Sequence, residues 1–286
     1  MLDFSKYHGL GNDFIIFDGI LHSIPPEIVL GNSLLIRKLC NRNFGIGGDG
    51  VLLLLPANDK ADFKMIIYNS DGTQAEMCGN GIRCIVKYLS DRHHIKGKVF
   101  IETLAGKISA DIDTNDNIEV DMGPPILDPI NIPCKLEVGT MGLPEAKITI
   151  ENRTLNIYSV GMGNPHMIVL VTNINSIPVT SWGPKLEFNN FFPAATNVHF
   201  VEITNRAQAD IIVWERGVGL TLACGTGACA CHVACNLLGL IDDKSTMSLP
   251  GGQLNISWSQ PGQNVLMSGK SEFVFNGTLT DFNLLK

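Results

Sequence analysis

Cys78-Gly79-Asn80-Gly81 is the stretch of sequence that decides the fold, because it is repeated later in the chain as Cys224-Gly225-Thr226-Gly227. A second tetrapeptide, Gly9-Leu10-Gly11-Asn12, is repeated as Gly161-Met162-Gly163-Asn164. The two repeats keep the same order and nearly the same offset. One glycine-rich match would be weak, whereas two in order indicate a duplicated unit. The sequence therefore predicts two similar domains that face each other.

Short β-type runs bounded by turn formers dominate the chain, and helical spacing is rare. Two predicted helices, Gly79 to Ser90 and Gly225 to Leu238, begin directly after the repeated cysteines. A third is predicted from Leu34 to Cys40. Both cysteines are therefore expected at a helix N-terminus. The predicted strands cover residues 14–17, 51–55, 63–68, 99–102, 118–122, 167–171, 197–203, 209–214, 253–258 and 272–275.

These elements predict an α/β fold of the α+β kind with two domains. The proline-rich stretch from Gly123 to Pro133 is interpreted as a linker. We expect an N-terminal domain over residues 1–123, completed by a C-terminal strand within 272–286, and a C-terminal domain over residues 124–271.

Composition restricts the function. The chain has 286 residues, 45% of them hydrophobic and 17% charged, as expected of a globular protein with a sizeable core. Its net charge is −7 and it has no basic run with interleaved aromatics, so no nucleic-acid partner is expected. No signal peptide and no membrane-spanning apolar run are visible, which predicts a cytoplasmic protein without a membrane partner. The eight cysteines are then expected to be thiols, and their spacing predicts no metal site.

A thiol at a helix N-terminus differs chemically from an ordinary one. The pKa of a free cysteine is roughly 8.5, and unpaired N–H groups together with the helix dipole lower it. The same N–H groups form an anion site that suits a carboxylate. Cys78 and Cys224 could hold one carboxylate between two sulfurs. One sulfur, as thiolate, would remove the proton from the adjacent carbon, and the other, as thiol, would return a proton to the opposite face.

Residues near the repeats fit this chemistry, but each also has an ordinary interpretation. His166 and Glu215 could tune a thiol proton, and Arg216 could grip a carboxylate. A single buried cysteine is more often an apolar core residue, a Glu-Arg pair is usually solvated, and Asn in a Gly-Asn turn usually serves the backbone. The remaining histidines are expected to be structural or surface groups: His8, His93, His94, His199 and His232.

Gly45-Ile46-Gly47-Gly48-Asp49-Gly50 matches the dinucleotide fingerprint G-x-G-x-x-G. That fingerprint must follow a strand and open a helix, whereas this stretch follows a predicted helix and precedes a predicted strand. No lysine stands in a context that singles out a pyridoxal phosphate Schiff base. No cofactor is expected.

Five separated motifs follow one another along the chain. They are Lys6-Tyr7-His8-Gly9-Leu10-Gly11-Asn12-Asp13-Phe14, Asn69-Ser70-Asp71-Gly72, Glu76-Met77-Cys78-Gly79-Asn80-Gly81-Ile82-Arg83-Cys84, Gly163-Asn164-Pro165-His166 and Trp214-Glu215-Arg216-Gly217 followed by Ala223-Cys224-Gly225-Thr226-Gly227. Together they resemble diaminopimelate epimerase, in order and over nearly the whole chain. The resemblance implies an enzyme that interconverts LL- and meso-diaminopimelate for lysine and peptidoglycan precursors without pyridoxal phosphate or metal. It implies two pseudo-symmetric domains, each a curved mixed sheet around a central helix, with the site in the cleft between them, and a homodimer.

The resemblance also implies roles for individual residues. Cys78 and Cys224 match the two acid/base residues, and His166 and Glu215 match the groups that assist them. Two positions depart from the common pattern and concern substrate preference: Gly50, where some members carry a Gln, and Leu220. The residues that match substrate-binding positions are Asn12, Asn69, Gly79, Asn80, Asn164, Asn197, Glu215, Arg216, Gly225 and Thr226.

Three functions remain open on the sequence. The first is this epimerase, which the Asn and Arg set favours because diaminopimelate has a second amino-acid end to be recognised. The second is a racemase or isomerase of the same fold that acts on another amino acid. The third is a non-catalytic binding or redox-sensing protein in which Cys78 and Cys224 form a reversible disulfide.

Overall fold

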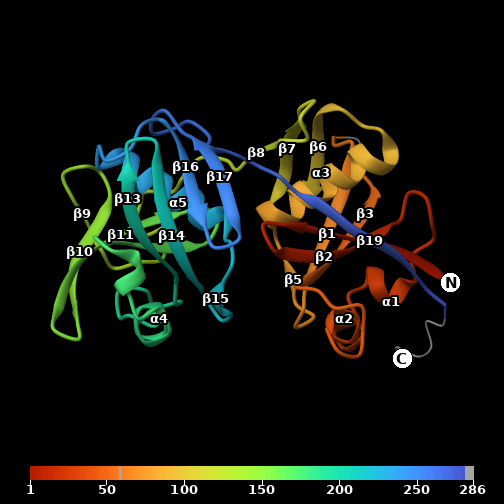
Figure 1. Ribbon diagram of the computed structural model, residues 1–286, viewed down its shortest axis with the longest axis horizontal. Coiled ribbons are helices and arrows are strands. Elements are labelled where there is room, and N and C mark those ends of the chain that lie inside the picture. Colours follow the sequence, from red (N-terminus) through yellow and green to blue (C-terminus); the bar gives the residue numbers. More distant parts are fainter. Residues whose placement is uncertain (58–59, 281–286) are drawn as a thin grey trace. The chain divides into compact units, whose positions relative to one another are not determined.

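The computed structural model describes residues 1–57 and 60–280 of the chain, which form two compact units. The first comprises Met1–Val120 and the segment that begins at Gly269, and the second comprises Asp121–Ser268. Each unit is a mixed sheet with few helices (Figure 1).

The first unit is a sheet in which parallel and antiparallel pairs alternate. β1 and β2 form a hairpin, β2 runs parallel to β3, β3 antiparallel to β4, and β4 parallel to β6. β6, β7 and β8 follow as an antiparallel meander, and the C-terminal β19 pairs with β1. The strands are β1 (Leu2–Gly9), β2 (Asn12–Asp18), β3 (Gly50–Pro56), β4 (Phe63–Asn69), β5 (Gln74–Ala75), β6 (Gly97–Thr103), β7 (Gly106–Ile112), β8 (Ile118–Asp121) and β19 (Glu272–Leu279).

The second unit repeats this pairing strand for strand. β11 and β12 form the hairpin, β12 runs parallel to β13, β13 antiparallel to β14, and β14 parallel to β16. β16, β17 and β18 form the meander, and β10 pairs with β11 as β19 pairs with β1. The duplication that two tetrapeptides indicate thus extends over the whole sheet. The strands are β9 (Glu137–Val138), β10 (Pro144–Ile150), β11 (Arg153–Gly161), β12 (Pro165–Leu170), β13 (Asn197–Asn205), β14 (Gln208–Glu215), β15 (Gly219–Thr221), β16 (Lys244–Leu249), β17 (Gly252–Ser257) and β18 (Leu266–Gly269).

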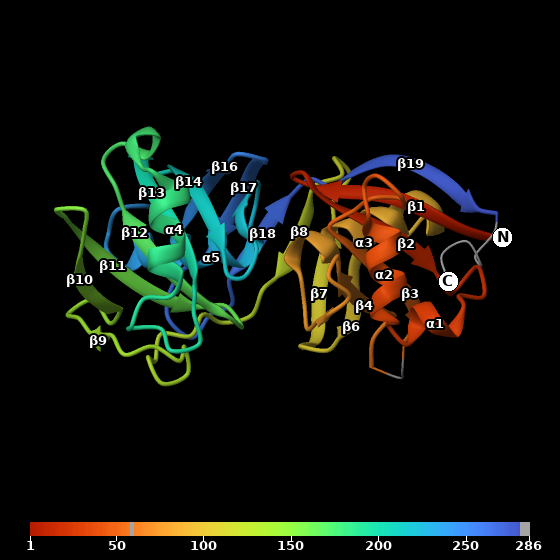
Figure 2. The same ribbon diagram turned by 90° about the horizontal axis from the view of Figure 1, so that it is seen from below.

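One long helix lies inside the curve of each sheet: α3 (Gly79–His93) in the first unit and α5 (Gly225–Leu237) in the second (Figures 1 and 2). α3 contacts strands of both the hairpin and the meander, and so does α5. A helix enclosed in this way must be apolar or small on nearly every side. α5 meets this requirement with an almost unbroken buried run of Gly, Ala, Cys and Val, in which His232 is the polar exception.

The opposite face of each sheet is covered by shorter helices. In the first unit α1 (Pro26–Val29) and α2 (Ser33–Cys40) pack on that face. In the second unit α4 (Val179–Glu187) takes this place, and Trp182 on it packs against Phe200 of β13. With helices on both faces, the central strands of each sheet are buried on both sides. Because the side chains of a strand alternate between the faces, one residue points toward the central helix and the next points toward the short helices.

The three predicted helices are confirmed within a few residues at their ends. The structure adds strands that the sequence did not predict, chiefly β1, β7, β10, β11 and β16, and the helix α4. The stretch from Gly123 to Pro133 has no helix or strand, but it packs on the second unit: Ile126 forms a β-bridge with Gly161, and Ile132 is buried. Among the described residues, none of the helices has the length and apolarity needed to cross a bilayer.

Candidate active site

Cys78 lies at the N-cap of α3, as predicted. Its backbone is extended (φ −145°), and the first helical bond runs from Ile82 N–H to the Cys78 carbonyl at 2.9 Å. The N–H groups of the three residues between them therefore have no partner within the helix, and they form a donor-rich helix end. The thiol is half-buried, with its Sγ 4.0 Å from Oδ1 of Asn12.

A chain of side-chain hydrogen bonds holds Asn12 beside this thiol. Asn12 Oδ1 accepts from Asn80 Nδ2 at 3.2 Å, and the buried Arg83 donates to Asn80 Oδ1 at 2.7 Å. On its other side Asn12 Nδ2 donates to Asp49 Oδ2 at 2.9 Å, and Arg42 in turn donates to Asp49 Oδ1 at 2.8 Å. Two of the predicted binding residues, Asn12 and Asn80, are thus fixed in one network.

Asp49 and Arg42 are site residues that the sequence analysis missed. Asp49 lies in the glycine-rich stretch that resembles a dinucleotide fingerprint, and this stretch joins the end of α2 to the start of β3. Asp49 uses Oδ2 to accept from both the side chain of Asn12 and the backbone of Asp13. Although burial raises the pKa of Asp13, hydrogen bonds from Arg42 and Lys6 lower it below its usual range, which keeps this carboxylate charged.

Asn69 is the last residue of β4, and its Nδ2 donates to Thr73 Oγ1 at 3.0 Å. The next residue, Ser70, donates its N–H to the carbonyl of Asp49 at 3.0 Å. The turn that carries Asn69 is therefore tied to the same loop that holds Asn12.

Cys224 occupies the N-cap of α5, again with an extended backbone (φ −129°). Its carbonyl accepts from Ala228 N–H at 2.9 Å, and its Sγ lies 3.5 Å from Oγ1 of Thr226. The side chain is buried, with 6% of its surface exposed. Gly225, Thr226 and Gly227 supply the N–H groups of the first turn, as Gly79, Asn80 and Gly81 do in α3. The two cysteines thus occupy equivalent positions in the two units.

His166 on β12 is fully buried between two hydrogen-bond partners. Its Nε2 lies 2.8 Å from Oδ1 of Asn164, and its Nδ1 lies 2.8 Å from Nε2 of His199 on β13. Burial, then the neighbouring His199 and Arg216, lower the pKa of His166 well below its usual value. Its ring is therefore neutral at physiological pH.

Glu215 is the last residue of β14, and Arg216 begins the turn that follows, which α4 anchors. The buried Glu187 at the end of α4 accepts from Trp214 Nε1 and from the N–H of Gly217, each at 2.8 Å. Asn197 accepts from the N–H of Arg216 at 3.0 Å, and Thr221 donates to Glu215 Oε1 at 2.6 Å. Glu187 is a further supporting residue that the sequence did not reveal.

The strand pairing shows where the two units differ chemically. β2 pairs Phe14 with Gly50 of β3, and β12 pairs His166 with Asn197 of β13. Unit 1 thus has Phe14 and Gly50 where unit 2 has His166 and Asn197. A Cβ on Gly50 would lie 2.6 Å from the carbonyl of Tyr68, so only glycine fits there. Leu220, the other unusual position, is exposed on β15.

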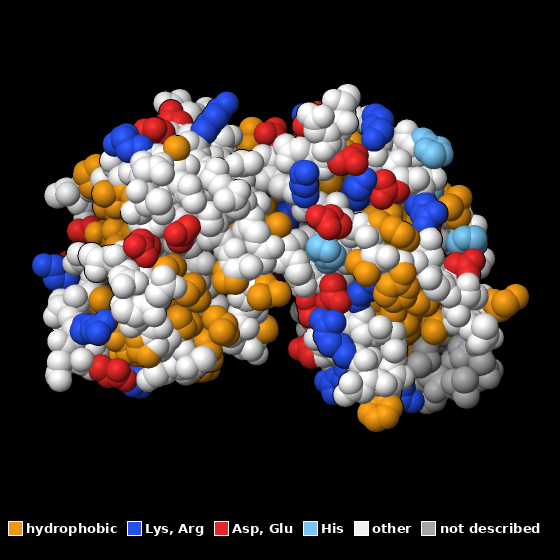
Figure 3. Space-filling model, viewed as in Figure 1, with side chains coloured by type: hydrophobic (Ala, Val, Ile, Leu, Met, Phe, Trp, Pro, Cys, Tyr) orange, Lys and Arg blue, Asp and Glu red, His pale blue; other side chains and the backbone are white. Residues whose placement is uncertain are grey.

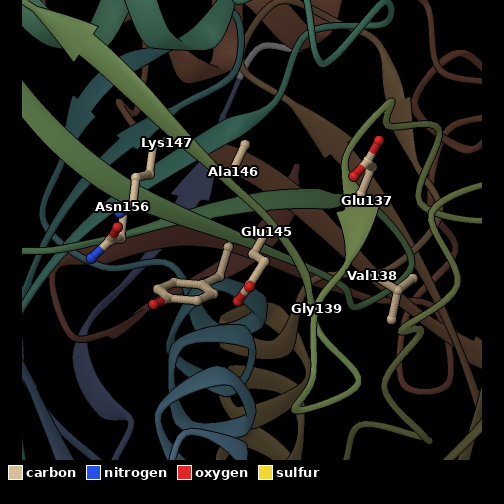
Figure 4. A pocket seen from close by; sticks show the side chains of 8 residues that line it. Glu137, Val138, Gly139, Glu145, Ala146, Lys147 and Asn156 are labelled. Atoms are coloured by element: carbon tan, nitrogen blue, oxygen red, sulfur yellow. The ribbon is translucent and has the colours of Figure 1, made fainter.

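A pocket of about 410 Å³ lies away from these residues, at β9, β10 and β11 (Figure 4). Glu137 and Glu145 are paired residues of β9 and β10 and line this pocket together with Lys147, Asn156 and Tyr158. None of the predicted site residues contributes to this pocket. Within residues 1–57 and 60–280, no group of three or more His, Cys, Asp and Glu side chains is placed to hold a metal ion.

Known proteins match this chain over nearly its full length. The sequence profile of the diaminopimelate epimerase family matches residues 4–127 and 158–274. The diaminopimelate epimerase of Prochlorococcus marinus (strain NATL1A) is 49% identical over 279 residues, covering 97% of this chain and 98% of the relative. That of Carboxydothermus hydrogenoformans is 45% identical over 278 residues, covering 96% and 98%.

Solved structures of lower identity share the fold. A hydroxyproline epimerase from Agrobacterium vitis matches with a TM-score of 0.68 at 17% identity, covering 96% of this chain and 91% of its own. A phenazine biosynthesis protein of the PhzF family from Bacillus anthracis matches with a TM-score of 0.66 at 14% identity, covering 96% and 98%. The chain thus has two central helices in duplicated sheets, each with a cysteine at its N-cap, and relatives that are 45% and 49% identical to it over nearly its whole length. It belongs to the diaminopimelate epimerase family and is an isomerase of the epimerase class.

Proposed function

We propose that this enzyme interconverts LL- and meso-diaminopimelate by a two-base transfer of the α-proton between Cys78 and Cys224. The observation that carries this proposal is the equivalent placement of both thiols, each at the N-cap of a buried central helix. In each turnover one cysteine, as thiolate, removes the α-proton from one face of the carbon. The other cysteine, as thiol, delivers a proton to the opposite face, and the roles exchange in the reverse reaction.

The helix ends supply what this chemistry needs most. Removal of an α-proton places negative charge on the carboxylate, and fixed N–H donors stabilise that charge best when they are already oriented. Gly79, Asn80, Gly225 and Thr226 lie in the two first turns, whose N–H groups precede the first intrahelical bonds. The same positive helix ends favour the thiolate form of a cysteine. The required groups are thus all residues of the chain, and we propose that no cofactor takes part.

His166 and Glu215 are proposed to assist the thiols as proton-handling neighbours. His166 is neutral because burial lowers its pKa, so it can accept or donate a hydrogen bond without adding a fixed charge. Glu215, the last residue of β14, accepts a hydrogen bond from Thr221. Asn12, Asn69, Asn164, Asn197 and Arg216 are proposed to bind the substrate, with Arg216 gripping the distal carboxylate.

We further propose that the protein forms a homodimer through β19. This strand pairs with β1 along one edge, and its apolar side chains remain exposed: Phe273 by 44%, Val274 by 48% and Phe275 by 42%. Hydrophobic side chains lie among charged ones over this part of the first unit (Figure 3). An exposed apolar edge strand favours pairing with a second copy.

We propose that the enzyme works in the cytoplasm. Its eight cysteines are expected to be thiols, and thiols persist in a reducing compartment.

The test is turnover by reduced protein that has been dialysed against EDTA and treated with hydroxylamine to remove any carbonyl cofactor. LL-Diaminopimelate should be converted to a mixture with the meso form, whereas glutamate and hydroxyproline should not be racemised. A protein that is folded and reduced but leaves LL-diaminopimelate unchanged would contradict the substrate assignment. Activity that returns only on addition of pyridoxal phosphate would contradict the cofactor-free mechanism.

A further inference from the structure

His199 lies between His166 and the first turn of α5. Its ring is fully buried, its Nε2 is 2.8 Å from His166 Nδ1, and the two ring centroids are 5.0 Å apart. On its other side the ring packs so closely on Gly227 that a Cβ there would lie 2.1 Å from His199 Cε1. His199 is thus confined by the helix that carries Cys224 and hydrogen-bonded to His166.

The first unit shows that packing alone does not require a histidine at this place. Because Gly50 and Asn197 are equivalent, Leu52 occupies on β3 the position that His199 occupies on β13. A Cβ on Gly81, the counterpart of Gly227, would likewise meet Leu52, at 3.3 Å from its Cδ2. A leucine therefore fills this space in one unit, whereas the other unit buries a polar ring at a cost in desolvation. The hydrogen bond to His166 is what the histidine provides and a leucine does not.

The hydrogen bonds determine which nitrogens carry protons. Asn164 Oδ1 is an acceptor, so His166 must carry its proton on Nε2, and a neutral ring then has a lone pair on Nδ1. His199 must therefore donate from Nε2 and keep a lone pair on Nδ1. This agrees with its Nδ1, which has no hydrogen-bond partner among the described residues. The reversed arrangement would bury an N–H without an acceptor, which is rarer in proteins than an unsatisfied acceptor.

We propose that His199 is a positioning residue that, together with Asn164, fixes His166 as the Nε2–H tautomer and holds its ring in place for the reaction. This inference rests on the role of His166 in the proposed function. His199 itself touches neither substrate nor a reacting atom in this account. A residue that orients a catalytic imidazole sets which of its nitrogens can give or take a proton.

Two substitutions separate this role from packing. His199→Leu copies the residue of the first unit and should fold, but it removes the donor to His166, so kcat should fall about 10- to 100-fold with little change in KM. His199→Gln keeps an N–H donor and should recover activity to within a few-fold of the wild type. His232→Leu is the control, because His232 on α5 is another buried histidine of the second unit and bonds Ser245 instead, and it should retain kcat.

The tautomer itself can be read by long-range ¹H–¹⁵N correlation on ¹⁵N-labelled protein, with the His166 signals assigned from a His166→Gln sample. The wild type should show a proton on Nε2 of His166 and a hydrogen-bonded Nδ1. His199→Leu should keep the Nε2 proton, which Asn164 still accepts, but its Nδ1 ¹⁵N signal should shift to that of a nitrogen without a hydrogen bond. A wild-type His166 protonated on Nδ1, or unchanged kcat and an unchanged Nδ1 signal in a folded His199→Leu, would overturn the inference. Wild-type protein without epimerase activity would instead contradict the proposed function, and the spectrum would still test the role of His199.

Discussion

Two thiols, at the N-cap and in the interior of α3, illustrate how position separates the cysteine that we propose as catalytic from a structural one. Cys78 is half-buried at the helix N-terminus, where N–H groups lack partners within the helix. Cys84 belongs to the same helix but is fully buried beside Ser271, and burial raises its pKa to about 12. A thiol with that pKa carries almost no thiolate at neutral pH, so it cannot serve as a base.

Cys78→Ala and Cys224→Ala should each reduce epimerisation by about 10²- to 10⁴-fold, because each removes one of the two proton-transfer groups. Cys84→Ala is the matched control and should keep activity within a few-fold. The rates can be followed by chiral chromatography of LL- and meso-diaminopimelate. A Cys224→Ala enzyme with near-wild-type turnover in both directions would rule out the paired mechanism.

At the scale of residues, the sequence predicted those parts of the candidate site that lie inside short motifs. The repeated cysteines and their glycines were found because their spacing to the following helix is local. Asp49, Glu187 and His199 were missed, since each acquires its role only through contacts with another strand or helix. His199 was expected to be a structural or surface group, and nothing local in its sequence distinguishes it from an ordinary core residue.

The contact between the central helix and a side chain of its sheet is tighter at Gly227 in the second unit than at the equivalent Gly81 in the first. Gly227→Ala should destabilise the protein by about 1–3 kcal/mol, because the new Cβ would collide with the confined ring of His199. Gly81→Ala should cost less, since its nearest neighbour is the flexible end of Leu52 and alanine favours a helix. Urea unfolding of both variants checks this. An equal loss in both would mean that His199 can move aside.

Helix α4 affects the site through Glu187, which anchors the turn that carries Glu215 and Arg216. Glu187→Ala removes the acceptor for both Trp214 Nε1 and the N–H of Gly217 and should release this turn. We expect KM for diaminopimelate to rise about tenfold, equivalent to roughly 1.4 kcal/mol of lost binding. Glu187→Gln, which keeps one acceptor oxygen, should lie between. Unchanged KM in a stable Glu187→Ala enzyme would show that the turn is held by other contacts.

At the scale of elements, the sequence predicted α3 and α5 well because a glycine-rich turn and a small or apolar run mark them. It missed α4, which contains Gly183 and Pro184, residues that normally argue against a helix. Gly183 is required there, because a Cβ would lie 2.3 Å from the Trp214 ring. It also missed the β10–β11 hairpin, whose turn residues Glu151 and Asn152 have positive φ but include no glycine.

The whole molecule should lose stability in mild acid because the second unit buries three neutral histidines. Burial lowers the pKa of His199 to about 3 and that of His232 to about 4, and it lowers the pKa of His166 well below its usual value. Between about pH 6.5 and pH 4 the unfolded chain therefore binds protons that the folded chain does not. The free energy of unfolding should fall as pH falls, by about 1.4 kcal/mol per pH unit for each such proton.

Urea unfolding from pH 7.5 to pH 5 measures this slope. His232→Gln should reduce it by about one proton, because burial lowers the pKa of His232 to about 4. A slope of zero below pH 6 would mean that the buried histidines become charged without unfolding.

The architecture of the whole molecule was predictable mainly because the chain is duplicated. The two repeated tetrapeptides indicated two similar units, and the strand pairing repeats between the units as well. The pairing of β19 with β1 joins the two ends of the described chain, and periodicity could only suggest it. Register between such distant strands depends on tertiary packing, which no local pattern encodes.

The paired-thiol mechanism is tested most directly by following the first turnovers of LL-diaminopimelate in deuterated water with reduced, cofactor-free enzyme. If one cysteine removes the α-proton and the other supplies the new one, early meso product should carry one deuterium at the inverted α-carbon while the remaining LL substrate stays unlabelled. Deuterium appearing in the LL substrate as fast as in the product would indicate a single base that serves both faces. That result, or product without deuterium, would contradict the account.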